Sequence, residues 1–200
     1  MPIGYLKEGE NLLAVLVWYY GNEGRNNTDS GEAGFIFACE ALNLYSDSSF
    51  LVALHPAYLY GGDNVGFNAN LDFGDFTALD FEENGFEAAV EYENRVWGDC
   101  LESQLPFLYV AEKQDLKFIR TEAGAEGELP YAMTMSVCFE LEAAGGEVID
   151  IRTDRYCING GPGDEHHTYN GHRIEYTAAK GRNVYECPMY LYSPTIIGLR

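Results

Sequence analysis

The densest group of side chains that could bind a metal ion lies in the second half of the chain. Asp164, His166 and His167 stand together, and His172 follows five positions after His167. Carboxylate and imidazole groups bind zinc, manganese or iron. Consecutive residues of a strand point to opposite faces, so His166 and His167 could share one ion only where the backbone is not extended. Glycine and asparagine flank the group on both sides, which favours a polar surface loop over a metal site.

Aromatic rings beside acidic groups form a second set of candidates. Sugars stack their C–H faces on such rings, while carboxylates and amides meet their hydroxyl groups. Trp97 stands close to Asp99, and Tyr58 and Tyr60 precede Asp63. The candidate sugar-binding residues are therefore Trp97, Asp99, Tyr58 and Tyr60. Aromatic rings also fill the cores of β-sandwiches, so packing is the competing interpretation for each ring.

Catalytic residues are harder to find in this sequence. Hydrolysis of a glycosidic bond needs two carboxyl groups at a separation that the mechanism fixes. The chain has 32 acidic residues, too many for the sequence to single out a pair. It contains no Gly-x-Ser-x-Gly elbow and no phosphate-binding glycine loop. The sequence predicts a binding or supporting role without a cofactor, and it leaves calcium open for the acidic residues 63–102.

Charge and cysteine content narrow the partners and the compartment. A formal net charge of −20 disfavours nucleic acid and anionic membranes, because their phosphate groups would be repelled. The five cysteines are widely spaced and include no Cys-x-x-Cys pair. We expect them to be reduced packing residues, which favours the cytoplasm. No apolar segment approaches the ~20 residues that a membrane span requires.

The elements that must position these groups are predicted to be strands. Leu12–Tyr20 is an unbroken apolar and aromatic run, which predicts a buried strand with Trp18 in the core. Residues 133–142 alternate between apolar and polar and predict a half-buried strand. A glycine turn at 144–147 should join it to residues 148–153 as a hairpin. Further strands are expected at 34–40, 50–58, 104–110, 116–120, 171–178, 183–190 and 195–199.

This pattern predicts an all-β fold, an antiparallel β-sandwich of jelly-roll-like type with little helix. Residues 121–130 are small, acidic and glycine-rich, and they end in proline, which suits an exposed linker. We therefore expect two sandwich modules in tandem. Residues 1–120 would form an accessory domain that lacks its first strands, and residues 131–200 would begin a second module. One sandwich with a long connection at 121–130 is the alternative.

Several short strings follow one another in a recognisable order. In the first half they are Tyr5–Trp18, Asp29–Phe35, Ser46–Phe50 and His55–Tyr58, and in the second half they are Leu129-Pro130, Ile149–Asp154, Arg173–Tyr176 and Asn183–Cys187. The series resembles the N-terminal, non-catalytic β-sandwich region of bacterial α-L-rhamnosidases, a family of glycoside hydrolases. The resemblance touches most of the chain, although each string is short.

The resemblance implies a supporting role. In that family, acidic residues of an (α/α) six-hairpin barrel hydrolyse terminal rhamnosyl groups with inversion, and this chain has neither the helices nor the length for such a barrel. It would instead brace the catalytic domain of a parent enzyme and contact rhamnose-containing glycans. Open sheet edges further predict a homo-oligomer. The alternative is a free-standing small hydrolase, a glycosidase or a metal-dependent enzyme, that uses the acidic and histidine residues at 164–172.

Overall fold

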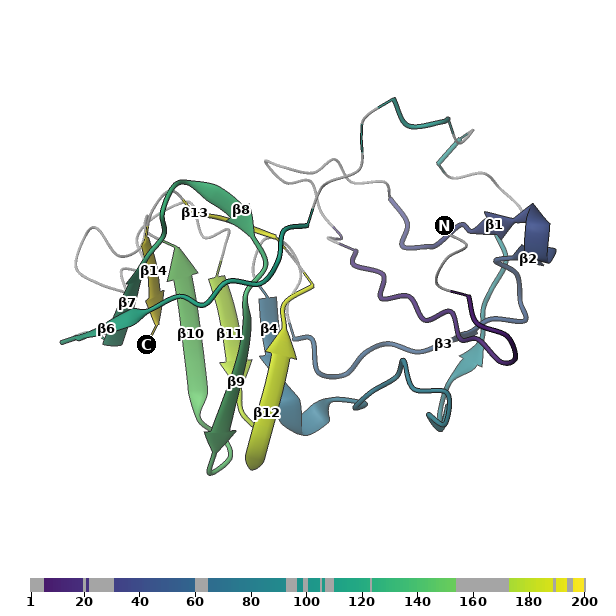
Figure 1. Ribbon diagram of the computed structural model, residues 1–200. Helices are drawn as coiled ribbons and strands as arrows, with labels where there is room; N and C mark the ends of the chain where they lie inside the picture. Colours follow the sequence, from purple (N-terminus) through teal and green to yellow (C-terminus); the bar gives the residue numbers. More distant parts are fainter. Residues whose placement is uncertain are drawn as a thin grey trace. The chain divides into compact units, whose positions relative to one another are not determined.

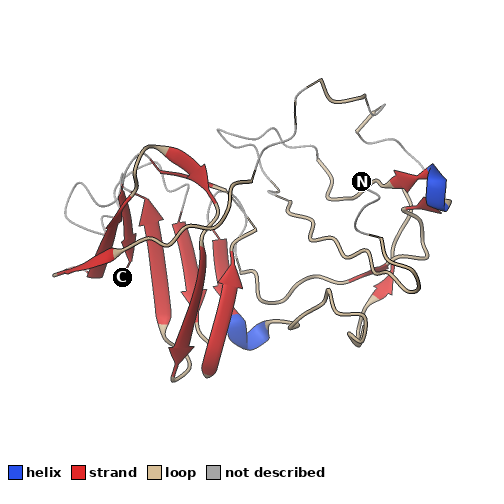
Figure 2. Ribbon diagram, viewed as in Figure 1, coloured by secondary structure: helices blue, strands red, loops and turns tan. Residues whose placement is uncertain are grey.

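The computed structural model describes the 200-residue chain at residues 6–19, 21, 31–59, 65–92, 97–98, 101–104, 106, 110–122, 124–153, 173–188, 190–193 and 196–199. Strands dominate these ranges, and the described helical elements are two short 3-10 turns (Figures 1 and 2). The predicted all-β class is confirmed, whereas the jelly-roll-like sandwich stays a prediction. The chain forms two compact units: unit 1 comprises Met1–Pro56 and Phe73–Leu101, and unit 2 comprises Ala57–Asp72 and Glu102–Arg200.

Unit 1 is built from very short strands. Its elements are β1 (Ala38–Cys39), η2 (Glu40–Leu42), β2 (Leu44–Tyr45), β3 (Leu51–Val52) and β5 (Glu87–Ala88). β1 pairs with β2 and β3 pairs with β5, in both cases antiparallel. Asn43 adopts the left-handed conformation, with φ of 50°, which lets the chain turn between η2 and β2.

A small aromatic cluster holds part of unit 1 together. The ring centroid of Phe73 lies 4.7 Å from that of His55 and 5.4 Å from that of Phe86. Phe81 stands 5.8 Å from Phe86 in an edge-on arrangement. His55 is half-buried within this cluster. Even so, none of the described residues of unit 1 is buried, so this cluster is a satellite rather than a core.

Unit 2 contains the larger sheet. Its order is β4-β11-β10-β14-β7-β6, and all its pairs are antiparallel except β4 with β11. β9 pairs with β12, and β8 pairs with β13. The bounds are β4 (Val65–Asn68), η3 (Ala69–Leu71), β6 (Phe118–Thr121), β7 (Gly124–Glu128), β8 (Met133–Met135), β9 (Cys138–Ala143), β10 (Val148–Thr153), β11 (Arg173–Thr177), β12 (Gly181–Glu186), β13 (Leu191–Ser193) and β14 (Ile196–Leu199).

The core of unit 2 lies between the large sheet and the β9–β12 pair. The Tyr176 ring, from β11, is stacked 5.7 Å from that of Phe67 in β4. Across the core it meets Phe139 of β9 and Tyr185 of β12, each at a centroid distance of 4.9 Å. Rings from four strands therefore join the two layers, which Figure 1 shows with β9 in front of β11 and β12 in front of β4.

Two turns carry the chain from one layer to the other. The turn after β9 is closed by the Glu147 carboxylate, which accepts hydrogen bonds from the backbone N–H groups of Ala144 (2.8 Å) and Gly145 (2.7 Å). The turn after β11 lies beside it, because Gly146 N–H donates to the Ala178 carbonyl and Ala178 N–H donates to the Glu147 carbonyl, both at 2.8 Å. The two turns are therefore joined to each other by backbone hydrogen bonds.

The predicted hairpin around residues 144–147 is therefore wrong. β9 and β10 are consecutive, but β9 pairs with β12 while β10 pairs with β11 and β14. The predicted strand 133–142 is also divided into β8 and β9, which serve different partners. At the break, the Val137 carbonyl accepts a hydrogen bond from Cys187 N–H at 2.8 Å. Alternation reports which side of a strand is buried, and it does not report the partner strand.

The prediction of a buried strand at Leu12–Tyr20 is wrong for the residues that the structure describes. Residues 12–19 belong to no described sheet. The side chains of Leu12, Val15 and Val17 are exposed, and Trp18 is half-buried. An apolar run becomes a buried strand only where a second strand or layer covers it, and no described segment of unit 1 does so here.

The expected linker has its own secondary structure. Residues 124–128 form β7, which is paired on one side with β6 and on the other with β14. Gly127 suits this place, because a Cβ atom there would lie 2.8 Å from Leu116 Cδ2 and 3.1 Å from Phe118 Cε1. Glycine thus lets the side chains of Leu116 and Phe118 lie against β7. The predicted modules, divided at residues 121–130, have different bounds from the two observed units. Unit 2 also contains residues 57–72.

Asn183 offers a test of the core of unit 2. Its buried side chain accepts from Tyr176 Oη (3.0 Å) and Ala179 N–H (2.8 Å), and it donates to the carbonyls of Ala179 (2.8 Å) and Gly181 (2.7 Å). We expect Asn183→Ala to lower the free energy of unfolding by about 1–3 kcal/mol, because it leaves buried polar groups unsatisfied. Urea unfolding followed by circular dichroism would measure this. The exposed neighbour Arg182→Ala is the control, and an equal loss there would contradict the assignment.

Burial of the tyrosines predicts an alkaline transition. Burial raises the pKa of Tyr58 to about 12 from 10.0, and it also raises the pKa of Tyr176 and Tyr185. A raised folded-state pKa means that the folded state holds its proton more tightly than the unfolded state. The stabilisation is complete below pH 10.0 and is lost as the pH rises toward 12. Ultraviolet titration should show these phenols ionising only as the protein unfolds; ionisation without unfolding would contradict this.

Candidate functional site

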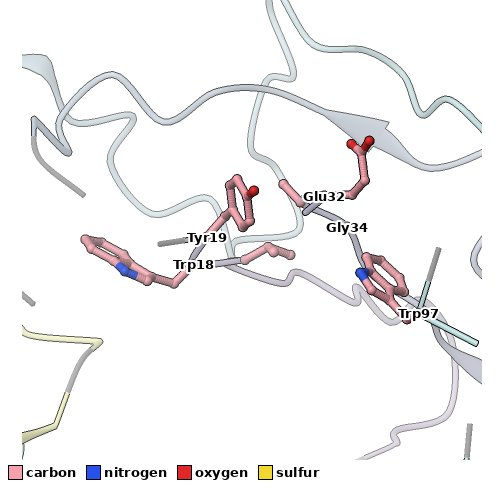
Figure 3. A pocket seen from close by; sticks show the side chains of 7 residues that line it. Trp18, Tyr19, Glu32, Gly34 and Trp97 are labelled. Atoms are coloured by element: carbon pink, nitrogen blue, oxygen red, sulfur yellow. The ribbon is translucent and has the colours of Figure 1, made fainter. Parts of the chain in front are cut away.

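A shallow pocket in unit 1 is the strongest candidate for a functional site. Its volume is about 210 Å³, and it is lined by Val17, Trp18, Tyr19, Glu32, Ala33, Gly34 and Trp97. Two segments far apart from Trp97 in the sequence thus meet around its ring: the end of the apolar run and the residues just before β1. Figure 3 shows these side chains. The volume is below the range of drug-sized ligand sites, so one small ring is the largest ligand it could hold.

The Trp97 ring packs directly against the backbone of Gly34. A Cβ atom at Gly34 would overlap Trp97 Cη2 and would lie only 2.7 Å from Cζ2, so no side chain fits between the backbone and the indole. Trp97 as a whole still keeps 38% of its surface exposed. Figure 3 shows it beside Gly34 at one side of the pocket. A flat aromatic face held against backbone and partly open to solvent can stack on an apolar ligand face.

The other side of the pocket differs in character. Figure 3 shows the Trp18 indole pointing away from the Trp97 indole, so the two rings do not form a clamp. Tyr19 and Glu32 lie between them and supply a phenol and a carboxylate. The pocket therefore combines one stacking surface with two groups that can hydrogen-bond hydroxyl groups. It does not combine two carboxylates at a catalytic spacing.

The structure separates the predicted sugar-binding residues. Trp97 lines this pocket in unit 1, whereas Tyr58 belongs to unit 2, where its ring stands 5.0 Å from Phe67 and contributes to the core. Asp99 and Tyr60 lie outside the described residues. The sequence reasoning missed Tyr19, Glu32 and Gly34. The signal for Gly34 was its place in the string Asp29–Phe35, which stood out in the sequence without a structural reason.

The predicted metal-binding residues Asp164, His166, His167 and His172 all lie outside the described residues. Within the described part of the chain, no three histidine, cysteine, aspartate or glutamate side chains gather so that they could hold a metal ion. No described helix is long and apolar enough to cross a membrane. Of the described cysteines, Cys187 is buried, Cys39 is half-buried and Cys138 is exposed, so the expected packing role fits Cys187 and does not fit Cys138.

Four charged side chains form a group on the large sheet of unit 2, on the face opposite the aromatic core. Asp150 accepts from Arg152 at 2.6 Å and from Arg173 at 2.8 Å, and Arg173 also binds Glu175 at 2.7 Å. Asp150 and Glu175 are register partners, so this is a pair of carboxylates side by side. Arg173 binds both, however, and the two acids and two bases balance. The group stabilises the pairing of β10 with β11 rather than presenting a free acid and base.

A larger groove in unit 1 is mainly apolar. It has a volume of about 430 Å³ and is lined by Val52, Ala53, Leu54, Pro56, Phe73, Asn84, Gly85 and Glu87. Asn84 and Gly85 form part of its lining. The structure has a turn there, with Gly85 at a φ of 83°, followed by β5. The groove offers few polar groups and suits a sugar less well than the Trp97 pocket.

Comparisons with known proteins give one partial similarity. No family model and no curated protein matches the chain. Among solved structures, the chain is similar to the crystal structure of a GH78 family rhamnosidase of Bacillus sp. GL1, with a TM-score of 0.28 and 19% sequence identity. The match covers 45% of this chain and 10% of that one. The match is therefore limited to less than half of this chain and a tenth of that one.

The packing of the Trp97 indole on Gly34 can be tested by fluorescence, because the chain has only two tryptophans. In a Trp18→Phe background, all tryptophan emission comes from Trp97. We expect Gly34→Ala to displace the indole, so its emission should shift to longer wavelength and acrylamide should quench it more strongly. The Trp18→Phe chain alone is the control. Unchanged emission and quenching would show that Trp97 does not rest on Gly34.

Proposed function

We propose that this chain is a non-catalytic accessory region of a glycoside hydrolase of the α-L-rhamnosidase kind, and that its unit 1 contacts a neutral sugar at the Trp97 pocket. The observation that carries the proposal is the exposed Trp97 indole seated on Gly34, with a phenol and a carboxylate beside it. A deoxysugar such as rhamnose presents a C–H face and a methyl group to such a ring, and its hydroxyl groups to Tyr19 and Glu32.

The sequence supports the same proposal independently. The ordered strings that resemble α-L-rhamnosidases run through both units, and they include the Asp29–Phe35 segment that contributes three residues to the pocket. Among the described residues, the cross-strand carboxylates Asp150 and Glu175 are both bound by Arg173 and do not form a free acid–base pair. A sugar-contacting surface without catalytic acids suits a region that supports a catalytic domain and holds its substrate nearby.

Binding of L-rhamnose to the purified chain tests the proposal. We expect the sugar to raise the melting temperature of the wild type, since a ligand that binds only the folded state stabilises it. Trp97→Ala should weaken binding at least about tenfold, or about 1.4 kcal/mol, through loss of the stacking surface. Tyr92→Ala is the matched control, because Tyr92 is another exposed ring of unit 1 that does not line the pocket.

The same preparation should be assayed for hydrolysis of p-nitrophenyl α-L-rhamnoside with and without added zinc or calcium. No hydrolysis, together with binding that depends on Trp97, would support the accessory role. Hydrolysis above background that a metal enhances would replace it with the free-standing hydrolase. Equal binding by the wild type and Trp97→Ala would remove the pocket from the proposal.

A further inference from the structure

The two edges of the large sheet of unit 2 differ in how their backbone groups are covered. At one edge, β4 is covered by the residues before it: Leu59 N–H donates to the Gly66 carbonyl at 2.9 Å, and Asn68 N–H donates to the Ala57 carbonyl at 2.8 Å. At the other edge, β7 is the one described strand that pairs with β6. Figure 1 shows β6 projecting at the far side of this sheet. The outer edge of β6 can therefore accept another strand.

The side chains of β6 are unusual for an edge that faces water. Ile119 is 74% exposed and Phe118 is 40% exposed. Exposed edges are normally short, charged or covered, because an apolar edge pairs readily with another chain. β6 is short and carries Arg120, but its first two residues are apolar, and the burial of Ile119 and Phe118 would favour association.

The charge around β6 favours a second copy of the same chain as the pairing strand. The chain as a whole carries a net charge of −20, so most surfaces of two copies repel each other. The β6 segment is an exception: residues 112–122 contain three acids and three bases, which are Glu112, Asp115, Glu122, Lys113, Lys117 and Arg120. Residues 112–122 therefore carry no net charge, and a second copy can approach along β6 without the repulsion that the charge of the whole chain would cause.

Symmetry then limits the register. Two identical strands paired antiparallel about a two-fold axis place one residue opposite its own copy. An axis at Arg120 would oppose two guanidinium groups, which is unfavourable. An axis at Phe118 would place Lys117 against Ile119. An axis at Ile119 places Ile119 against its copy and Phe118 against the second copy's Arg120, which allows a cation–π contact on both sides.

We propose that a second copy of this chain pairs with β6 in antiparallel fashion about a two-fold axis at Ile119, which joins the two large sheets into one. The interface is small and should give a weak, concentration-dependent dimer. The proposal does not depend on the sugar-binding function, since the Trp97 pocket belongs to unit 1.

Analytical ultracentrifugation of the full chain tests the dimer. We expect the wild type to reach the mass of two chains by about 100 µM, and Ile119→Lys to raise the dissociation constant at least about tenfold, by placing two ammonium groups face to face. Val148→Lys is the matched control, because Val148 is an exposed valine of the same sheet on a strand paired on both sides. A wild type that stays a single chain, or a dimer that Ile119→Lys leaves intact, would overturn the proposal.

Oxidative cross-linking tests the register. Opposed residues of an antiparallel pair have Cα atoms about 4.5–5.5 Å apart, within reach of a disulfide. Ile119→Cys should form a disulfide-linked dimer faster than Lys117→Cys, with the wild type treated identically to account for its native cysteines. Equal rates for the two variants, or no cross-linked product above the wild type, would overturn the Ile119 axis.

Discussion

The packing of Tyr176 against rings from three other strands is the interaction on which unit 2 depends. Tyr176 lies on β11, in the middle of the core, and contacts Phe67, Phe139 and Tyr185. Its hydroxyl group is satisfied by Asn183, which also fixes the turn between β11 and β12. Tyr176 therefore joins the two layers, and its buried hydroxyl group is bonded to the residue that holds the turn. The opposite face of β11 carries Arg173 and Glu175, so the same strand anchors both the core and the charged group on the sheet.

Unit 1 has no comparable centre among its described residues. Its apolar side chains remain largely exposed, and its two strand pairs are two residues long each. The Trp97 pocket, which we propose contacts a sugar, lies in this less tightly packed unit, and ligand-contacting surfaces are often drawn from the less stable parts of a protein. In this unit the absence of a side chain at Gly34 lets the Trp97 ring lie directly against the backbone.

The sequence predicted the fold class and the inward side of several strands, but not their partners. Alternation correctly placed Phe139 and Leu141 on one side of β9, because side-chain direction is a local property. Pairing depends on distant segments, so the crossing at 144–147 looked like a hairpin. The apolar run at 12–19 misled for the same reason, since burial requires a covering layer that the run itself does not encode. Trp97 was identified from its chemistry, whereas Tyr19, Glu32 and Gly34 joined it only through the fold.

The path of the chain through unit 2 has a consequence for its synthesis. β4 pairs in parallel with β11, and the Asn70 amide just after β4 donates to the Ala178 carbonyl, 108 positions further along the chain. At about 5–20 residues per second, the ribosome completes β11 about 5–20 s after β4 has emerged. Throughout that interval Val65 and Phe67, which are buried in the finished protein, have no sheet to join. The nascent chain must therefore keep β4 from premature contacts until its second half arrives.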